Sequence, residues 1–252
     1  MKVLCIDMGN TRTHSALIED GRVVKSWEDP TDGFADAFDA AKLKKDGACG
    51  VSWCSVVPRE AALLQVRLQE MPSSCGVFHL TNETSPIRLD VKTPSAVGQD
   101  RIAGAVGAGL LFKPPYIIVD MGTAVTIDLV DASGAYAGGA IAPGLHAFTD
   151  YLNERTALLP SINPTLADYD MTIGKDTVEA MYVGCVKGFC RLSDGIISDI
   201  EKAYFGGTSS AAKTVFTGGS VSLLPKKWLA GRKVESNLAN MGLFESFKKL
   251  NA

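Results

Sequence analysis

The feature that most constrains this chain is a short motif that occurs twice, once in each half. Asp7-Met8-Gly9 follows an apolar run near the N-terminus, and Asp120-Met121-Gly122 follows a second, β-branched run. After each copy come a predicted strand, an acidic turn that contains glycine and another predicted strand. The two aspartates lie close to half a chain length apart. The repetition predicts two domains of similar topology, formed by duplication, that face each other across a cleft.

The length of the chain agrees with this organisation. A chain of 252 residues can form one large domain or two smaller ones, because single cores stop growing at roughly 250–300 residues. The duplicated motif favours two, and Lys113-Pro114-Pro115 interrupts regular structure between them. We predict an N-terminal domain over residues 1–114 and a C-terminal domain over residues 115–252, both built from mixed strands and helices.

Charge and composition exclude several classes of protein. The chain has 25 Lys+Arg against 28 Asp+Glu, without the basic surplus typical of nucleic-acid or anionic-membrane binding. Its uncharged stretches are shorter than the ~20 residues that cross a bilayer, and its first apolar run is too short for a secretory signal. We therefore expect a cytoplasmic protein with no nucleic-acid or membrane partner. The cysteines and histidines lack metal-binding spacing, so any metal is expected to be bound by oxygen.

Apolar periodicity and turn residues predict the remaining elements. The predicted helices span 32–45, 58–71, 100–112, 145–155, 174–203 (as one or two helices) and 238–250. The predicted strands after the first three span 50–57, 76–80 and 214–217. Residues 81–96 are predicted to be a polar loop, and the glycine-rich residues 138–144 a connector into the following helix.

The repeated motif suits phosphate binding for a physical reason. Glycine lets backbone N–H groups approach phosphate oxygens, hydroxyl and amide side chains add donors, and the carboxylate can hold a cation. A single Asp-x-Gly is more simply explained as a hairpin turn. Two copies at this spacing favour a pair of phosphate or cation sites. The chain contains neither a P-loop nor a dinucleotide-binding fingerprint.

A second candidate site is the segment Gly98-Gln99-Asp100-Arg101, which begins a predicted helix. Helix N-termini favour anions, so an acidic substrate group is expected to bind the backbone amides and Arg101, with Asp100 beside it. Local sequence alone favours a simpler role for Asp100, as a helix-capping or first-turn acid.

In this order, the segments Asp7–Thr11, Gly98–Arg101, Asp120–Thr126 and 138–144 resemble a type III pantothenate kinase. The resemblance covers nearly the whole chain and continues through 156–160, 174–177, 217–219 and the pairs Asn237-Leu238 and Gly242-Leu243. That family belongs to the superfamily of acetate and sugar kinases, heat-shock chaperones and actin. The resemblance therefore implies two ribonuclease-H-like domains.

The resemblance also implies an activity: ATP-dependent phosphorylation of the primary hydroxyl of pantothenate, the first step of coenzyme A synthesis. Asp100 would be the general base. The implied ATP and phosphate contacts are Asp7, Met8, Gly9, Asn10, Thr11, Arg12, Thr13, His14 and Thr123. The implied pantothenate contacts are Gly98, Gln99, Asp100, Arg101 and Thr177. Asp7 would lie near Mg²⁺, Asp120 would bind a monovalent cation (K⁺ or NH₄⁺), and the protein would be a homodimer.

Two alternatives stay open at this point. One is a kinase of the same superfamily that acts on a sugar or a carboxylate. The other is a non-catalytic regulator that binds ATP. The presence of Asp7, Asp100 and Asp120 together favours an enzyme, because a regulator could have lost any of them.

Overall fold

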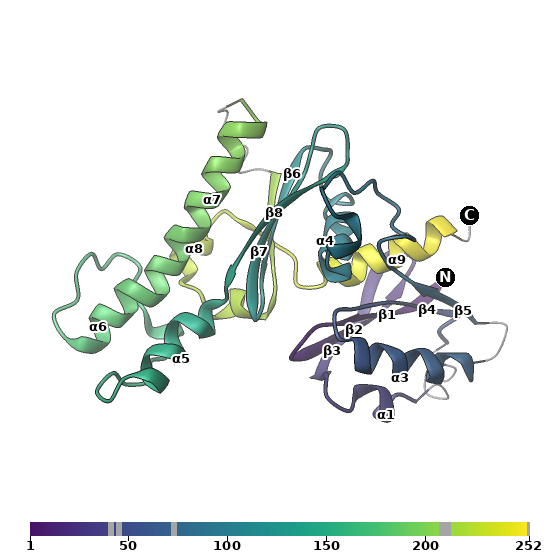
Figure 1. The fold of residues 1–252 in the computed structure, drawn as a ribbon, viewed down its shortest axis with the longest axis horizontal. Coiled ribbons are helices and arrows are strands. Elements are labelled where there is room, and N and C mark those ends of the chain that lie inside the picture. Colours follow the sequence, from purple (N-terminus) through teal and green to yellow (C-terminus); the bar gives the residue numbers. More distant parts are fainter. Residues whose placement is uncertain (40–42, 44–46, 72–74, 207–212, 251–252) are drawn as a thin grey trace. The chain divides into compact units, whose positions relative to one another are not determined.

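The computed structural model describes the whole chain except residues 40–42, 44–46, 72–74, 207–212 and 251–252. It divides into two compact units (Figure 1). Unit 1 contains Met1–Pro114, Ala132–Ala137 and Asn237–Ala252, and unit 2 contains Pro115–Asp131 and Gly138–Ser236.

The two units have sheets of the same topology. Unit 1 has the five-stranded order β3-β2-β1-β4-β5, and the second sheet has the order β10-β9-β6-β7-β8. The central strands β1 and β6 are antiparallel to the next strand in sequence and parallel to β4 and β9 respectively. The strands are β1 (Lys2–Met8), β2 (Arg12–Glu19), β3 (Arg22–Pro30), β4 (Gly50–Ser55), β5 (Gly76–His79), β6 (Tyr116–Met121), β7 (Ala124–Val130), β8 (Tyr136–Pro143), β9 (Thr214–Thr217) and β10 (Lys233–Val234). This repeated order confirms the predicted α/β fold class and the duplication.

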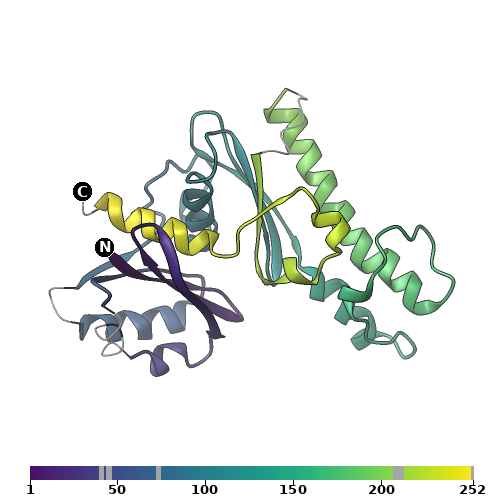
Figure 2. The same cartoon turned by 180° about the vertical axis from the view of Figure 1, so that it is seen from behind.

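The sheet of unit 1 is covered by helices on both faces (Figures 1 and 2). On one face, α1 (Phe34–Ala37) and α3 (Pro58–Gln69) pack over an apolar core that includes Ile6, Met8 and Leu64. On the other face lie α4 (Gln99–Ala108) and α9 (Leu238–Leu250), and Ser52 of β4 donates a 2.7 Å hydrogen bond to the backbone of α9. Alternation along β1 therefore directs Ile6 and Met8 toward α1 and α3, and Asp7 toward α4 and α9.

Glycines allow α9 to lie very close to its neighbours. A Cβ added at Gly107 of α4 would overlap the backbone of Leu238, and one added at Gly242 of α9 would overlap the backbone of Ala103. The ring of Phe247 similarly occupies the space above Gly50 of β4. The closing helix of the chain is thus built into the core of unit 1.

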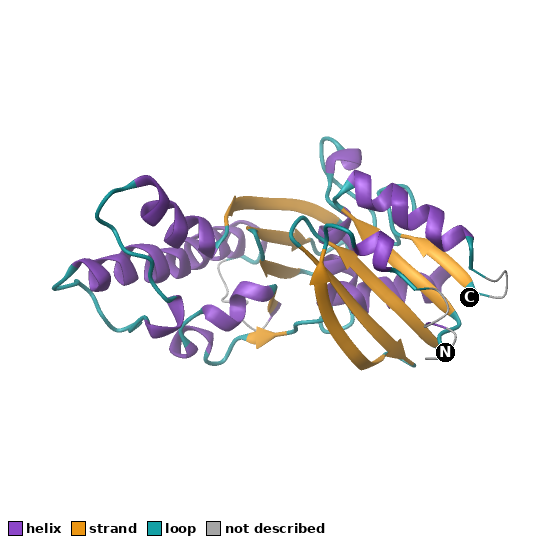
Figure 3. Cartoon of the chain, turned by 90° about the horizontal axis from the view of Figure 1, so that it is seen from below, coloured by secondary structure: helices purple, strands orange, loops and turns teal. Residues whose placement is uncertain are grey.

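The longest helical segment of unit 2 is one continuous run, and shorter helices are separate from it (Figure 3). Helix α5 (Leu145–Arg155) follows β8, and α6 (Thr177–Met181) continues through the π-helical turn η3 (Tyr182–Lys187) into α7 (Gly188–Tyr204). The shorter elements of unit 2 are the 3₁₀ turns η2 (Pro164–Leu166) and η5 (Gly219–Leu223) and helix α8 (Lys226–Leu229), and unit 1 has one further 3₁₀ turn, η1 (Pro94–Ala96), among its described residues. Among the described residues, none of the helices has the length and apolar character required to cross a membrane.

The structure differs from the predicted elements in two places. The predicted helix 32–45 contains α1 and is interrupted at Phe38, whose backbone is extended; residues 40–42 and 44–46 of the prediction lie outside the described residues. The predicted connector 138–144 is wrong, since residues 138–143 belong to strand β8. Its glycines are required by close strand approach: a Cβ at Gly139 would overlap the backbone of Ile127 in β7.

The chain passes from unit 1 to unit 2 between Pro114 and Pro115. Helix α9 and the turn Ala132–Ala137 belong to unit 1, although they follow the boundary in sequence. The turn is held there by backbone bonds in both directions between Tyr136 and the segment Arg88–Asp90.

Candidate active site

Asp7 is placed at the end of the central strand of unit 1. It is paired with His14 across the antiparallel ladder and with Cys54 across the parallel ladder. The thiol of Cys54 donates a 3.3 Å hydrogen bond to Oδ1 of Asp7. Burial, and then repulsion from Asp100, raise the pKa of Asp7 to about 7, although the Cys54 bond opposes this. Two acids from separate segments therefore share one region of low dielectric.

Asp100 lies in the first turn of α4, on the face of the sheet toward which Asp7 points. Its Oδ1 accepts a 2.8 Å hydrogen bond from the backbone N–H of Arg101. A Cβ at Gly98 would overlap the Asp100 carboxylate, so a larger residue there would displace that carboxylate from its present position. The guanidinium of Arg101 lies 5.7 Å from the ring centre of Tyr136. The segment predicted to hold the general base therefore lies beside the first Asp-Met-Gly turn.

Gln99 ties the beginning of α4 to the ends of two strands. Its Oε1 accepts a 2.9 Å bond from the backbone N–H of Ser55, and lies 3.1 Å from Nε2 of His79. The ring of His79 stacks on Trp53 with centroids 3.7 Å apart and planes at 6°. Burial lowers the pKa of His79, so the ring is neutral near pH 7 and donates its Nε2–H to Gln99. Sequence reasoning had no signal for His79.

The turn between β1 and β2 is held by one buried threonine. The N–H of Gly9 donates to the Arg12 carbonyl over 3.1 Å, which closes the turn. Thr31 donates from Oγ1 to the Gly9 carbonyl over 2.7 Å and from its N–H to the Thr11 carbonyl over 3.2 Å. Its hydroxyl is also 3.0 Å from that of Thr13. Thr31 was not singled out from the sequence, because nothing local distinguishes it from other turn threonines.

The predicted phosphate-loop residues fall into two groups. Met8 and Thr13 are fully buried, so their side chains contribute to the core, and only their backbone can face a phosphate. Asn10, Thr11 and Arg12 are exposed, with side chains accessible to a ligand. His14 is half-buried, and burial lowers its pKa while Glu28 acts in the opposite direction.

Unit 2 builds an equivalent turn around Asp120. Asp120 ends β6 and is paired with Thr126 of β7 and Thr217 of β9. The N–H of Gly122 donates to the Ala124 carbonyl over 3.1 Å, as Gly9 does in unit 1. Gly218 has φ 93° and lies against the Asp120 carboxylate and the backbone of Met121, where a Cβ would overlap both.

Thr123 and Thr177, the other candidates in unit 2, are both exposed. The Thr123 carbonyl accepts a 3.1 Å bond from Gly144, the residue before α5, and a Cβ at Gly144 would overlap that carbonyl. Thr177 is the first residue of α6, after the N-cap Asp176, whose side chain accepts from the N–H of Glu179 over 2.9 Å. The structure thus groups Asp7, Gly98, Gln99, Asp100 and Arg101 in unit 1, and Asp120 and Thr123 around a second turn in unit 2.

Comparison with known proteins identifies the family. The family model of type III pantothenate kinases matches residues 3–199. The chain belongs to the type III pantothenate kinase family. A relative with that name from Listeria monocytogenes is 32% identical over 235 residues, 89% of this chain and 88% of its own. Another from Akkermansia muciniphila is 34% identical over 232 residues, 90% of each chain.

Solved structures show the same fold at low identity. A protein from Campylobacter jejuni, described as a Baf family transcriptional activator, superposes with a TM-score of 0.67 at 20% identity over 98% of both chains. MreB5 of Spiroplasma citri, solved with ADP, superposes with a TM-score of 0.56 at 10% identity over 99% of this chain and 97% of its own. This pantothenate kinase thus has the fold of the actin-like ATPases. All of its candidate site residues lie within the matched 3–199.

Proposed function

We propose that this type III pantothenate kinase transfers the γ-phosphate of ATP to the primary hydroxyl of pantothenate, the first step of coenzyme A biosynthesis. The observation that carries the proposal is the proximity of two acids on one face of the unit 1 sheet. Asp7 ends β1, Asp100 begins α4, and their repulsion helps to raise the pKa of Asp7 to about 7. A phosphate-binding turn and a carboxylate base are the two parts that phosphoryl transfer to an alcohol needs.

Asp100 is assigned the role of general base. In phosphoryl transfer the transition state is loose, so the base mainly orients the acceptor hydroxyl and takes its proton late. The bond from Arg101 N–H to Oδ1 holds the Asp100 carboxylate in place. Gly98, Gln99 and Arg101 are assigned to the pantothenate site with it, and Thr177 of α6 to the same substrate.

The first turn is assigned to the phosphates. Thr31 fixes the turn through the Gly9 carbonyl, and Asn10, Thr11 and Arg12 present exposed side chains. These residues would bind and orient the phosphate chain of ATP, while the remaining residues of Asp7–His14 support the turn through their backbone. Thr123 is assigned to ATP from unit 2.

The residues present fit a divalent cation that is shared with ATP. Among the described residues there is no cluster of three or more metal-ligating side chains, so a dedicated protein cage is not available. Mg²⁺ typically binds one or two carboxylates together with substrate phosphates, and the carboxylate of Asp7, destabilised by Asp100, suits such a site. Asp7 would hold Mg²⁺, which when bound would neutralise charge on the phosphates.

Replacing the base tests the mechanism directly. We expect Asp100→Asn to reduce phosphopantothenate formation by about 10²-fold or more, with ATP binding retained. Product formation would be followed by mass spectrometry and ATP binding by calorimetry. Asp90→Asn, which alters an exposed acid of the same unit, is the matched control. A near wild-type rate for Asp100→Asn would refute the base assignment, and turnover only with sugars or acetate would refute pantothenate as the acceptor.

Asp120 is assigned to a monovalent cation, K⁺ or NH₄⁺. The end of β6, the glycine turn after it and Gly218 surround this carboxylate with backbone groups, and carboxylate and carbonyl oxygens are suitable ligands for hard cations. We expect Asp120→Asn to abolish the increase in rate that K⁺ produces over Na⁺ at equal ionic strength. An unchanged response to K⁺ would place the cation elsewhere.

A homodimer and a cytoplasmic location complete the proposal. The dimer is supported by exposed apolar side chains in unit 2, in the segment from α5 to α6, because exposed apolar groups of this kind mark protein interfaces. The cytoplasmic location stays a prediction from the sequence.

A further inference from the structure

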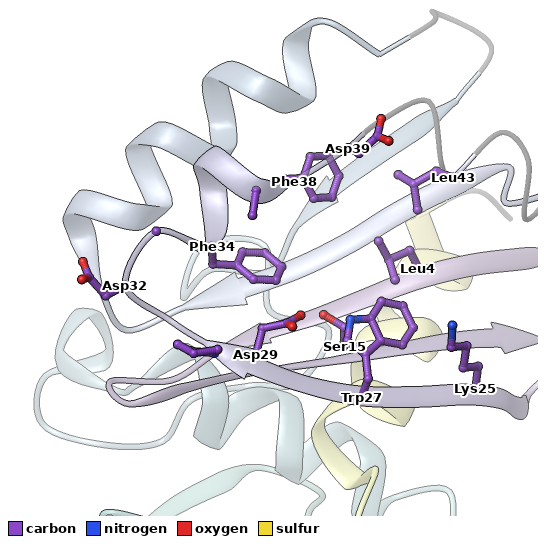
Figure 4. Close-up of a pocket in the computed structure, with 13 residues that line it drawn as sticks. Leu4, Ser15, Lys25, Trp27, Asp29, Asp32, Phe34, Phe38, Asp39 and Leu43 are labelled. Atoms are coloured by element: carbon purple, nitrogen blue, oxygen red, sulfur yellow. The ribbon is translucent and has the colours of Figure 1, made fainter.

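Unit 1 contains a cavity of about 380 Å³ on the face of its sheet opposite Asp7. One wall is apolar and contains Phe34, Phe38 and Leu43, and Leu4 of β1 lies on the sheet opposite them (Figure 4). The opposite wall is formed by side chains of β2 and β3. The cavity therefore has the size and apolar character typical of small-molecule sites.

Polar groups converge on the β2–β3 wall. Ser15, Trp27 and Asp29 lie on the same face because Ser15 is paired with Trp27, and Thr13 with Asp29. Figure 4 shows the Ser15 hydroxyl between the Asp29 carboxylate and the Trp27 indole nitrogen. Ser15 is 1% exposed, and its Oγ has no hydrogen-bond partner. A buried hydroxyl without a partner is costly, so this wall is incomplete without a bound molecule or water.

The electrostatic character of this wall indicates which ligand it suits. No ion pair is found for the half-buried Asp29 in the part of the chain that the structure describes. Among the described residues that line the cavity, the one cation is Lys25, whose Nζ lies 5.3 Å from the centre of the Trp27 ring. A carboxylate beside an aromatic ring and an acceptor hydroxyl matches an ammonium group, which is attracted by all three.

The cavity is linked to the phosphate turn through one short segment. Residues 29–34 run from the cavity wall at Asp29 to Phe34 on the opposite wall. Between them, Thr31 bonds the Gly9 and Thr11 carbonyls, and its own carbonyl accepts from the Phe34 N–H over 3.1 Å. A molecule that displaces Asp29 or Phe34 would therefore move the residue that holds the turn.

We propose that this cavity is a binding site for a small primary ammonium compound with an aromatic or apolar body, and that its occupation changes the affinity for ATP. The ammonium group binds Asp29 and the Ser15 hydroxyl, and the apolar body contacts Phe34 and Phe38. The coupling to ATP rests on the function proposed above, whereas the binding itself does not.

Calorimetry with 2-phenylethylamine tests the site, and 2-phenylethanol serves as the uncharged ligand of similar shape. We expect saturable binding of the amine to the wild type and binding at least tenfold weaker, to order of magnitude, for the alcohol. Asp29→Asn should weaken amine binding about tenfold, and Ser15→Ala a few-fold. Glu70→Gln removes an exposed acid of unit 1 outside the cavity and should leave binding unchanged.

These measurements test the ammonium site, its coupling to ATP and the proposed function separately. Equal binding of amine and alcohol, or equal binding to the wild type and Asp29→Asn, would overturn the ammonium site. Absence of amine binding to the wild type would overturn it as well, and would leave water as the occupant of the cavity. A KM for ATP that is unchanged by saturating amine would overturn the coupling. Calorimetric binding of ATP in the presence and absence of the amine gives the coupling independently of turnover, so failure of the pantothenate assay does not affect this test.

Discussion

The raised pKa of a single residue, Asp7, makes the stability of the protein depend on pH. Its pKa of about 7 lies above the ordinary 3.8, mainly because the carboxyl is buried and secondarily because Asp100 is near. A raised carboxyl pKa means that the folded state holds the proton more tightly than the unfolded state. The resulting stabilisation is complete below pH 3.8 and is lost as pH rises to about 7.

We therefore expect the ligand-free wild type to lose about 2 kcal/mol of unfolding free energy, relative to Asp7→Asn, between pH 5 and pH 8. Urea unfolding at several pH values measures this difference. Mg²⁺ with ATP should reverse the trend, because a cation favours the ionised carboxylate, so the ligand-induced increase in Tm should be larger at pH 8 than at pH 6. Parallel stability profiles of the two proteins would contradict the raised pKa.

Glycines allow neighbouring helices of this protein to pack with their backbones in close contact, as α4 and α9 do. Replacing a helical glycine with alanine usually stabilises a helix by up to about 1 kcal/mol. At Gly242 the new methyl group would overlap the backbone of Ala103, so we expect Gly242→Ala to destabilise the protein by about 1–3 kcal/mol. Urea unfolding followed by circular dichroism measures the effect.

Gly195 of α7 is the matched control for this prediction. It lies inside a helix and has open space where a Cβ would be added, so Gly195→Ala should be neutral or slightly stabilising. If both substitutions had the same effect, the close approach of α4 and α9 would not limit stability.

At the scale of the whole molecule, the proposed homodimer is the property to test. Five exposed apolar side chains lie in the segment from α5 to α6: Tyr151, Leu158, Leu166, Ile173 and Val178, with Leu158 90% exposed. We expect the double substitution Leu158→Asp and Ile173→Asp to convert the dimer to monomer in light scattering, because two charges would be buried at the interface. Val66→Asp, at an exposed position of α3, should leave the mass unchanged. A monomeric wild type, or a double variant that remains dimeric, would contradict this interface.

The sequence by itself determined the duplicated fold and the family. The two Asp-Met-Gly motifs follow buried central strands, because an apolar run that ends in a polar residue and glycine specifies a strand and a turn through local chemistry. The placement of Asp7, Asp100 and Asp120 at element ends was predictable for this reason. Alternation also makes Met8 predictable as a core residue, although it was grouped with the phosphate loop.

Only the tertiary structure decided which residues support these acids. Thr31 and His79 come from segments with no motif of their own, and Asn240 lies between two motif pairs without belonging to either. Asn240 of α9 donates 3.0 Å bonds to the carbonyls of Cys5 and His14, and thereby braces the strands that carry Asp7. Such contacts join residues that are far apart in sequence, and their energies depend on burial and on the direction of each hydrogen bond. Local patterns specify neither of these, because burial and direction exist only once the chain has folded.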